Sequence, residues 1–252
     1  MRNSKERFSD RVEHYVRYRP RYPRALMTVL SEEIGLDPRA VVADIGSGTG
    51  FSAEPFLEQG HRVFAIEPND EMRRAAERLY GDRAGFASAA GSAEATGLEG
   101  GSIDLVVCAQ AFHWFDPAAA RAEFERILRP PRWVALIWNR RLTRATEFLR
   151  EYETLLERFG TDYSAIRHER IDESVLGPFF AGGYARRGVP NQQLLDYEAL
   201  EGRLLSSSYT PPLKHPDHRP MLAALRALFE AHHVGGEVTM LYETEIYVGR
   251  LG

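Results

Sequence analysis

A glycine-rich segment that directly follows a short apolar run places the strongest constraint on how this chain can fold. The run at 40–45 is apolar and β-branched, as expected of a buried strand, and it leads into the sequence DIGSGTG at 44–50. The glycines allow tight, partly left-handed turns and let a ligand approach the backbone without contact to a Cβ atom. In an open parallel sheet such a loop lies at the carboxyl ends of the strands, where ligands bind.

Helix-like and strand-like segments alternate after this loop. Asn69 is expected to be the N-cap of a helix, and Gly60 is expected to follow the C-terminus of another. Strands alternating with helices of about ten residues predict an α/β fold, in which helices cover both faces of a mostly parallel sheet. Strands are expected at 61–67, 85–90, 103–109 and 133–138, and helices at 52–59, 69–79 and 117–128.

The rest of the chain is less regular. Residues 140–180 are predicted to be largely helical, with a further strand near 186–196. An amphipathic helix at 220–232 and a long alternating strand at 238–248, expected to be antiparallel, complete the chain. We expect one domain over 1–252 with four parts: an N-terminal arm and first helix (1–35), the core that carries the glycine-rich loop (36–139), a helical cap or insertion over the sheet edge (140–205), and a C-terminal helix and strand (206–252).

The spacing of the glycines separates two kinds of ligand. A dinucleotide fingerprint, G-x-G-x-x-G, needs its third glycine at position 51, where this chain has Phe51. Here the glycines are Gly46, Gly48 and Gly50, and Asp44 precedes them. Its carboxylate could hold an ammonium group directly or through water. The spacing therefore favours a ligand with an amino-acid moiety over a pyrophosphate, which needs a close approach to a helix N-terminus.

Glu67 ends the second predicted strand, 21 residues after Gly46. A carboxylate at this position can accept two hydrogen bonds from the vicinal hydroxyls of a ribose. The alternative is an acid on the surface at the end of a strand. Its combination with the glycine-rich loop favours the ribose contact.

Amino-acid composition limits the kinds of molecule that this chain is expected to bind. The chain has 32 Lys and Arg against 36 Asp and Glu, a formal net charge of -4, unlike the basic footprint of a dedicated nucleic-acid binder. The first 24 residues contain eight basic and three acidic side chains, which indicates a solvated arm or cations that face an anionic ligand. A single cysteine, Cys108, excludes an intramolecular disulfide and a multi-thiolate zinc cluster. With no secretory signal or membrane span predicted, we expect a soluble, cytoplasmic protein, a monomer or a homodimer.

Seven further motifs are YRPRYP at 18–23, VVADIGSGTG at 41–50, AIEPN at 65–69, GSAEATGL at 91–98, DLVVCAQAFHWFD at 104–116, LSSSYTP at 205–211 and YETEIYVG at 242–249. Together they resemble the class I S-adenosylmethionine-dependent methyltransferases, in particular the methyltransferase type 11 group close to trans-aconitate methyltransferase-like proteins. The resemblance covers nearly the whole chain, most tightly from about 15 to 140. It implies a Rossmann-like, seven-stranded, mostly parallel sheet with an antiparallel terminal hairpin.

The same resemblance implies a cofactor, S-adenosyl-L-methionine, with S-adenosyl-L-homocysteine as product, and a small-molecule methyl acceptor with a carboxylate or hydroxyl group. It also implies roles for individual residues. The methionine part of the cofactor would lie among Asp44, Gly46, Ser47, Gly48 and Gly50, the ribose and adenine beside Glu67, Pro68, Ser92 and Ala93, and the sulfonium above Gln110 and Ala111. Ser92 stands where many relatives carry Asp, so a hydroxyl or the backbone would make the adenine contact.

The segment after the fourth predicted strand is the best candidate for the acceptor site. His113 could act as a general base toward an acceptor hydroxyl or amine, because its ordinary pKa is near neutrality. Alternatively it orients a carboxylate, or it packs with Trp114 as an aromatic wall. Tyr18 and Arg19 in the arm are candidate substrate-binding residues, and Arg19 could pair with a carboxylate of cofactor or substrate, or anchor the arm. Further pocket candidates are Tyr209 and Trp138.

Three other functions are alternatives to a small-molecule methyltransferase. Phe51 and the lack of a Ser-Tyr-x-x-x-Lys arrangement count against a nicotinamide-dependent oxidoreductase. A cofactor-binding regulatory module without turnover would carry the same loop. A nucleic-acid methyltransferase has only the basic arm in its favour and lacks an Asn-Pro-Pro-Tyr or Asp-Pro-Pro-Tyr motif. No metal site is expected, since neighbouring histidines on a helix diverge by about 100°.

Overall fold

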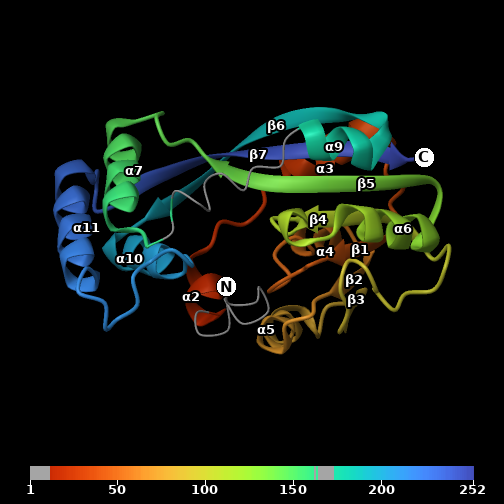
Figure 1. The fold of residues 1–252 in the computed structure, drawn as a ribbon, viewed down its shortest axis with the longest axis horizontal. Helices are drawn as coiled ribbons and strands as arrows, with labels where there is room; N and C mark the ends of the chain where they lie inside the picture. Colours follow the sequence, from red (N-terminus) through yellow and green to blue (C-terminus); the bar gives the residue numbers. More distant parts are fainter. Residues whose placement is uncertain (1–11, 162, 164–172) are drawn as a thin grey trace.

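The computed structural model describes residues 12–161, 163 and 173–252, so the first eleven residues of the predicted arm lie outside the described part. A seven-stranded sheet of order β3-β2-β1-β4-β5-β7-β6 forms its centre (Figure 1). The strands β1 to β5 run parallel to one another, and β7 pairs antiparallel with β5 and with β6. This confirms the predicted α/β fold. The strands are β1 Val41–Ile45, β2 Arg62–Ile66, β3 Phe86–Ala89, β4 Ile103–Ala109, β5 Leu128–Arg141, β6 Ala181–Leu195 and β7 Val238–Leu251.

Helices cover both faces of the parallel part of the sheet because its central strands are apolar on both sides. Along β1, Val42 packs into one buried cluster, with α3 and α4, whereas Ala43 and Ile45 pack into another, with α6 and α9. The described helices are α2 Val12–Tyr18, α3 Ala25–Ile34, α4 Glu54–Glu58, α5 Asp70–Tyr80, α6 Pro117–Ile127, α7 Glu147–Phe159, α9 Glu173–Phe180, α10 Tyr197–Leu205, α11 His218–His232 and the 3-10 turn η2 Phe112–Trp114.

Local capping explains where the helices next to the sheet edge begin. The Asn69 side chain accepts hydrogen bonds from the backbone amides of Glu71 and Met72, each at 3.0 Å, which confirms the predicted N-cap of α5. Asp116 caps α6 in the same way. Gly60 follows α4 with a φ of +84°, as predicted for that position. Asn69 and Asp116 lie in loops that follow strands, at the carboxyl edge of the sheet, whereas Gly60 lies in the loop that enters β2 at the opposite edge.

Strand β6 confirms the further strand expected near 186–196, and it begins earlier than expected, at Ala181. Its sequence has three glycines, a proline and two adjacent arginines, and it shows little strand alternation. Pairing with β7 along nearly its whole length holds it in place. The ends of β6 and β7 carry a second lobe made by α7, α10 and α11, at the left in Figure 1, with its own buried cluster.

The N-terminal arm joins the core to this second lobe. The Tyr18 hydroxyl donates a hydrogen bond of 3.0 Å to Glu198 on α10, and the Gln193 amide donates to the Tyr18 carbonyl oxygen. The Tyr18 ring lies directly against Gly202, where a Cβ atom would come within 2.1 Å of the ring. Only glycine fits this contact, so the arm and α10 meet at a fixed position. Residues 19–22 then pass along the carboxyl edge of the sheet, beside the glycine-rich loop.

Candidate active site

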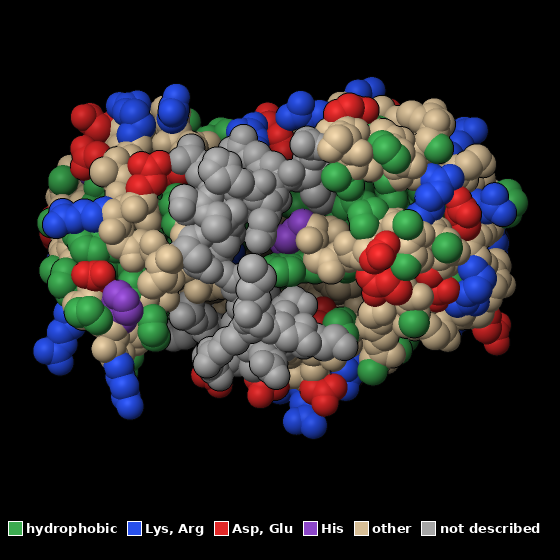
Figure 2. Space-filling model, viewed as in Figure 1, with side chains coloured by type: hydrophobic (Ala, Val, Ile, Leu, Met, Phe, Trp, Pro, Cys, Tyr) green, Lys and Arg blue, Asp and Glu red, His purple; other side chains and the backbone are tan. Residues whose placement is uncertain are grey.

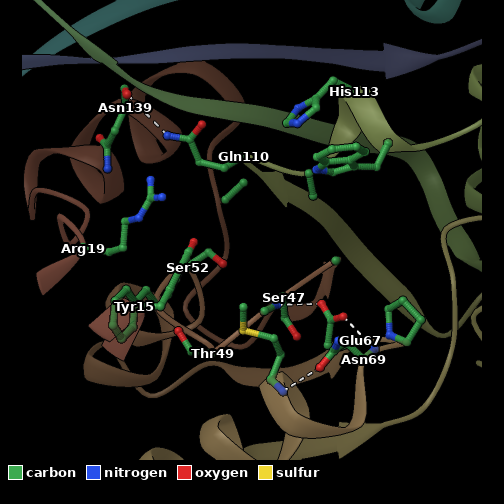
Figure 3. Close-up of a pocket in the computed structure, with 18 of the residues that line it drawn as sticks. Tyr15, Arg19, Ser47, Thr49, Ser52, Glu67, Asn69, Gln110, His113 and Asn139 are labelled. Carbon is green, nitrogen blue, oxygen red and sulfur yellow. Dashed lines mark hydrogen bonds between the residues drawn. The ribbon is translucent and has the colours of Figure 1, made fainter. Parts of the chain in front are cut away.

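A single cavity of about 420 Å³ extends from the glycine-rich loop to the second lobe. The loops after β1, β2 and β4 form one end of it, and the arm, α10 and residues 208–209 form the other. In Figure 3, Glu67 and Arg19 lie on opposite sides of this space, and Gln110 lies above it, beside Asn139. Segments far apart in the sequence therefore share one cavity. On the face shown in Figure 2, basic and acidic side chains are interspersed.

The glycine-rich loop takes the left-handed conformations that its composition predicts. The φ angles of Gly46, Gly48 and Gly50 are +68°, +56° and +82°. A Cβ atom on Gly46 would lie 2.6 Å from the Cβ of Ala111, so the loop after β1 packs directly on the loop after β4. Gly46 and Gly48 line the cavity, whereas Gly50 turns away from it and packs against Tyr80.

Beneath this loop lies a buried carboxyl group, Asp44. Its Oδ2 accepts a hydrogen bond of 2.7 Å from Ser52, while Oδ1 is buried without a hydrogen-bond partner in the described part of the chain. Burial raises its pKa from 3.8 to about 7, against the opposing effect of the Ser52 hydrogen bond, and nearby Glu67 adds to the rise. Ser47 Oγ and Thr49 Oγ1 are likewise buried and unpartnered. Three such atoms beside one loop fit a polar ligand group, such as an ammonium, that would satisfy them.

Glu67 holds the loop together from the end of β2. Its carboxylate accepts hydrogen bonds of 2.8 Å from the backbone amides of Gly48 and Asn69, one on each oxygen. Each oxygen keeps a further acceptor position, so the group can also receive two ligand hydroxyls. Burial raises its pKa above the ordinary value, although both amides oppose that rise.

Gln110, at the end of β4, has a conformation that non-glycine residues seldom adopt. Its φ is +58°, a strain of about 1–3 kcal/mol that tends to occur at functional sites. Its backbone amide donates to the carbonyl oxygen of Ile137, and its side chain donates to the carbonyl oxygen of Asn139 at 3.3 Å. Asn139 is itself held by Thr244 at 2.6 Å. This network holds Gln110 in the wall of the cavity, beside Asn139 (Figure 3).

His113 and Trp114 form the wall of the cavity that follows Gln110. Their ring centroids are 4.7 Å apart, and Trp114 is 38% exposed at the rim. Burial alone lowers the pKa of His113 to about 4, and its imidazole has no hydrogen-bond partner among the described residues. The imidazole is therefore neutral near pH 7, and no carboxylate orients it as a general base.

The second lobe supplies residues at the far end of the cavity. Arg19 points into it from the arm (Figure 3), and Arg203 on α10 and Tyr209 reach it from the second lobe. Sequence reasoning named Arg19 and Tyr209 but missed Arg203. Its only signal is its place two residues before the motif LSSSYTP, since its burial depends on packing between α10 and β7.

Most of the sequence-predicted residues come together in this cavity. It is lined by Arg19, Gly46, Ser47, Gly48, Glu67, Pro68, Ser92, Ala93, Gln110, Ala111, His113 and Trp114. Three others do not line it: Asp44 lies behind Ser52, Gly50 packs on Tyr80, and Tyr18 contacts α10. Trp138 also lies outside the lining and packs against Tyr247.

Among residues 12–161, 163 and 173–252, no group of three or more His, Cys, Asp or Glu side chains is placed to hold a metal ion. Across the same residues, every helix is too short or too polar to cross a membrane. The geometry therefore defines an α/β protein with a cavity at the carboxyl edge of its sheet, the place where open α/β sheets bind ligands.

Comparisons with known proteins identify the family. A methyltransferase domain family matches residues 43–136. An uncharacterized methyltransferase-like protein of Schizosaccharomyces pombe is 30% identical over 219 residues, covering 86% of this chain and 84% of that protein. An uncharacterized methyltransferase of Mycobacterium tuberculosis is 36% identical over 155 residues, covering 61% and 60%. A solved structure from Anaeromyxobacter dehalogenans, assigned as a type II methyltransferase, superposes with a TM-score of 0.66 at 26% identity, covering 92% of this chain and 98% of that one. The chain therefore belongs to the class I S-adenosylmethionine-dependent methyltransferases of the methyltransferase type 11 group.

Proposed function

We propose that this protein transfers a methyl group from S-adenosyl-L-methionine to a carboxylate or hydroxyl oxygen of a small organic metabolite. The observation that carries the proposal is the continuity of the cavity, which joins the glycine-rich loop and Glu67 to Arg19 and His113 through Gln110. A relative in Saccharomyces cerevisiae, 30% identical over 124 residues, is assigned as an S-adenosylmethionine-dependent methyltransferase, which agrees with this cofactor.

Each part of the cavity has a role in this proposal. Glu67 would accept the ribose hydroxyls, and Asp44 would balance the ammonium group of the methionine part. The loop at 46–49 would surround that part. The adenine would lie beside Pro68, Ser92 and Ala93, and the reacting end of the cofactor beside Gln110 and Ala111. S-adenosyl-L-methionine, when bound, supplies an electrophilic methyl group on its sulfonium.

The residues of this chain would contribute alignment and exclusion of water. Arg19 and Trp114 would bound the acceptor region, and His113 would orient the acceptor through a neutral imidazole. A carboxylate acceptor needs no base, since it is ionised at neutral pH. The lack of an orienting group on His113 is consistent with such an acceptor.

Calorimetric titration with S-adenosyl-L-methionine, S-adenosyl-L-homocysteine and NAD tests the proposal. We expect micromolar binding of both adenosyl ligands and none of NAD. Glu67→Ala should weaken the two adenosyl ligands by about 30-fold or more, because charge-assisted hydrogen bonds to the ribose are lost. Glu71→Ala, on the exposed first turn of the neighbouring α5, is the matched control and should leave the affinity unchanged.

Glu67 also binds two backbone amides, so Glu67→Gln, which retains the shape of the side chain, should be titrated beside Glu67→Ala. Binding of NAD by the wild type would contradict the proposal. Equal adenosyl affinity in the wild type and both Glu67 variants would contradict the assigned cofactor orientation.

A further inference from the structure

Two arginines at the far end of the cavity, the buried Arg203 and the half-buried Arg19, have neutral partners. Arg203 on α10 is 6% exposed, and its guanidinium donates to the Tyr242 hydroxyl at 3.3 Å and to Ser207 Oγ at 3.2 Å. Arg19 donates to the Ser206 carbonyl oxygen at 2.9 Å, while its Nε is buried without a partner. Among the described residues, neither arginine forms an ion pair with a carboxylate.

No described carboxylate neutralises this pair, although burial of Arg203 is outweighed by the hydroxyls of Tyr242 and Tyr209, which raise the pKa of its guanidinium. A third guanidinium nearby, that of Arg141, is matched by Glu153. Burial lowers the pKa of the Arg19 guanidinium, and neighbouring Arg203 lowers it further. Burial acts to raise the pKa of the Tyr209 hydroxyl, but the guanidiniums of Arg141, Arg203 and Arg19 outweigh it and bring this pKa below its ordinary value. Among the residues that the structure describes, this end of the cavity therefore carries an excess of positive charge.

An unpaired buried charge is costly, and proteins usually neutralise it with a partner or a ligand. The two arginines face the cavity beside Tyr209 and Ser208, whose segment 205–211 is the motif LSSSYTP. The cofactor residues of the proposed function lie at the other end, around Glu67. A guanidinium pair suits a carboxylate, because its planar donors match the two oxygens.

We propose that Arg19 and Arg203, together with Ser208 and Tyr209, form a subsite that holds a carboxylate of the methyl acceptor. This inference rests on the proposed function. Two guanidiniums withdraw charge from the group they bind and make it a weaker nucleophile, so this carboxylate orients the acceptor. The acceptor therefore carries a second nucleophilic group, a carboxylate or a hydroxyl, that receives the methyl group nearer to Gln110.

Thermal unfolding with succinate, and with succinamide as its neutral analogue, tests the subsite in the ligand-free protein. Succinate should raise the Tm of the wild type in proportion to its occupancy, and more than succinamide does. Arg203→Met should lose this difference, with succinate affinity about 30-fold lower by calorimetry. Arg186→Met removes an exposed arginine that is paired with Glu245, so it should keep the difference and controls for the general effect of salt.

The stability of Arg203→Met itself separates recognition from a structural role. An unpaired buried cation replaced by an apolar side chain should leave the Tm of the ligand-free protein unchanged or higher. A lower Tm together with an unchanged succinate effect would overturn the proposal. Arg203→Gln, which retains hydrogen bonding to Tyr242, provides the same comparison if the methionine variant does not fold.

The methionine carboxylate of the cofactor is the other possible source of the anion. S-adenosyl-L-homocysteine contains this carboxylate, whereas 5′-methylthioadenosine lacks it. We expect Arg203→Met to bind both with wild-type affinity; a loss confined to S-adenosyl-L-homocysteine would assign the subsite to the cofactor and overturn the inference. If the wild type binds neither adenosyl ligand, the proposed function fails, while the succinate experiment still reports on the arginine pair.

Discussion

The two ends of the cavity are built in different ways. The cofactor end uses backbone and strand-end groups from one continuous stretch, in which Glu67 binds the amide of Gly48 only 19 positions away. The acceptor end uses side chains from distant segments, since Arg19 contacts Ser206 and Ser207, 187 and 188 positions along the chain. Local sequence therefore determines the first end, and tertiary packing determines the second.

This difference also appears in the charges. At the cofactor end, the buried groups that find no partner in the described part of the chain are oxygens, on Asp44, Ser47 and Thr49, which suit a cationic or hydrogen-bond-donating ligand. At the acceptor end the buried atom without a partner among the described residues is Nε of Arg19, and the guanidiniums of Arg19 and Arg203 suit an anion. A ligand pair with an ammonium at one end and a carboxylate at the other would complement both. Three predictions test whether the two ends are as distinct as this.

The largest effect is expected from Gly46→Ala at the cofactor end. The added Cβ atom would lie 2.6 Å from the Cβ of Ala111, and the φ of +68° strains any side chain. We expect affinity for S-adenosyl-L-homocysteine, measured by calorimetry, to fall by about 100-fold. Gly35→Ala has a similar φ of +60° with no atom within 4 Å of the added Cβ, so it should lose stability but keep its affinity. Equal affinity in both variants would show that the packing of the two loops does not shape the cofactor end.

A smaller effect, on stability, is expected from Asp44. Its pKa of about 7 in the folded protein exceeds the ordinary 3.8, so the folded state favours the protonated acid. Its contribution to stability is therefore fully present below about pH 4 and is lost as the pH rises through 7, by up to about 4 kcal/mol. In urea unfolding, the free energy of unfolding of Asp44→Asn should increase relative to that of the wild type between about pH 4 and pH 8.

The same titration should affect ligand binding in the opposite direction. Because an ammonium group prefers the ionised carboxylate, wild-type affinity for S-adenosyl-L-homocysteine should rise through about pH 7, whereas that of Asp44→Asn should not. A constant stability difference between the two proteins across this range would contradict the elevated pKa. Such a result would also weaken the contrast of charge between the two ends.

The accuracy of the sequence-based predictions follows this contrast. Strand β1, the glycine-rich loop and the N-cap Asn69 were predictable because each depends on neighbouring residues. Strand β6 was expected only in part, since its pairing with β7 overrides a weak local pattern. Arg203 was missed because nothing in its helix distinguishes a buried arginine from an exposed one. Its burial depends on Tyr242, 39 positions away.

The smallest effect concerns His113, which lies between the two ends. Because burial alone lowers its pKa to about 4, its ring proton signals should titrate near pH 4 when they are followed by nuclear magnetic resonance and assigned with His113→Gln. Addition of S-adenosyl-L-homocysteine should not raise this midpoint, since a ligand in the cavity excludes more water from the imidazole. A midpoint at the ordinary value of 6.5, or a clear rise on ligand binding, would mean that a charged or hydrogen-bonding group faces the ring. The imidazole would then be a competent general base near pH 7, and the acceptor would be expected to react through a hydroxyl.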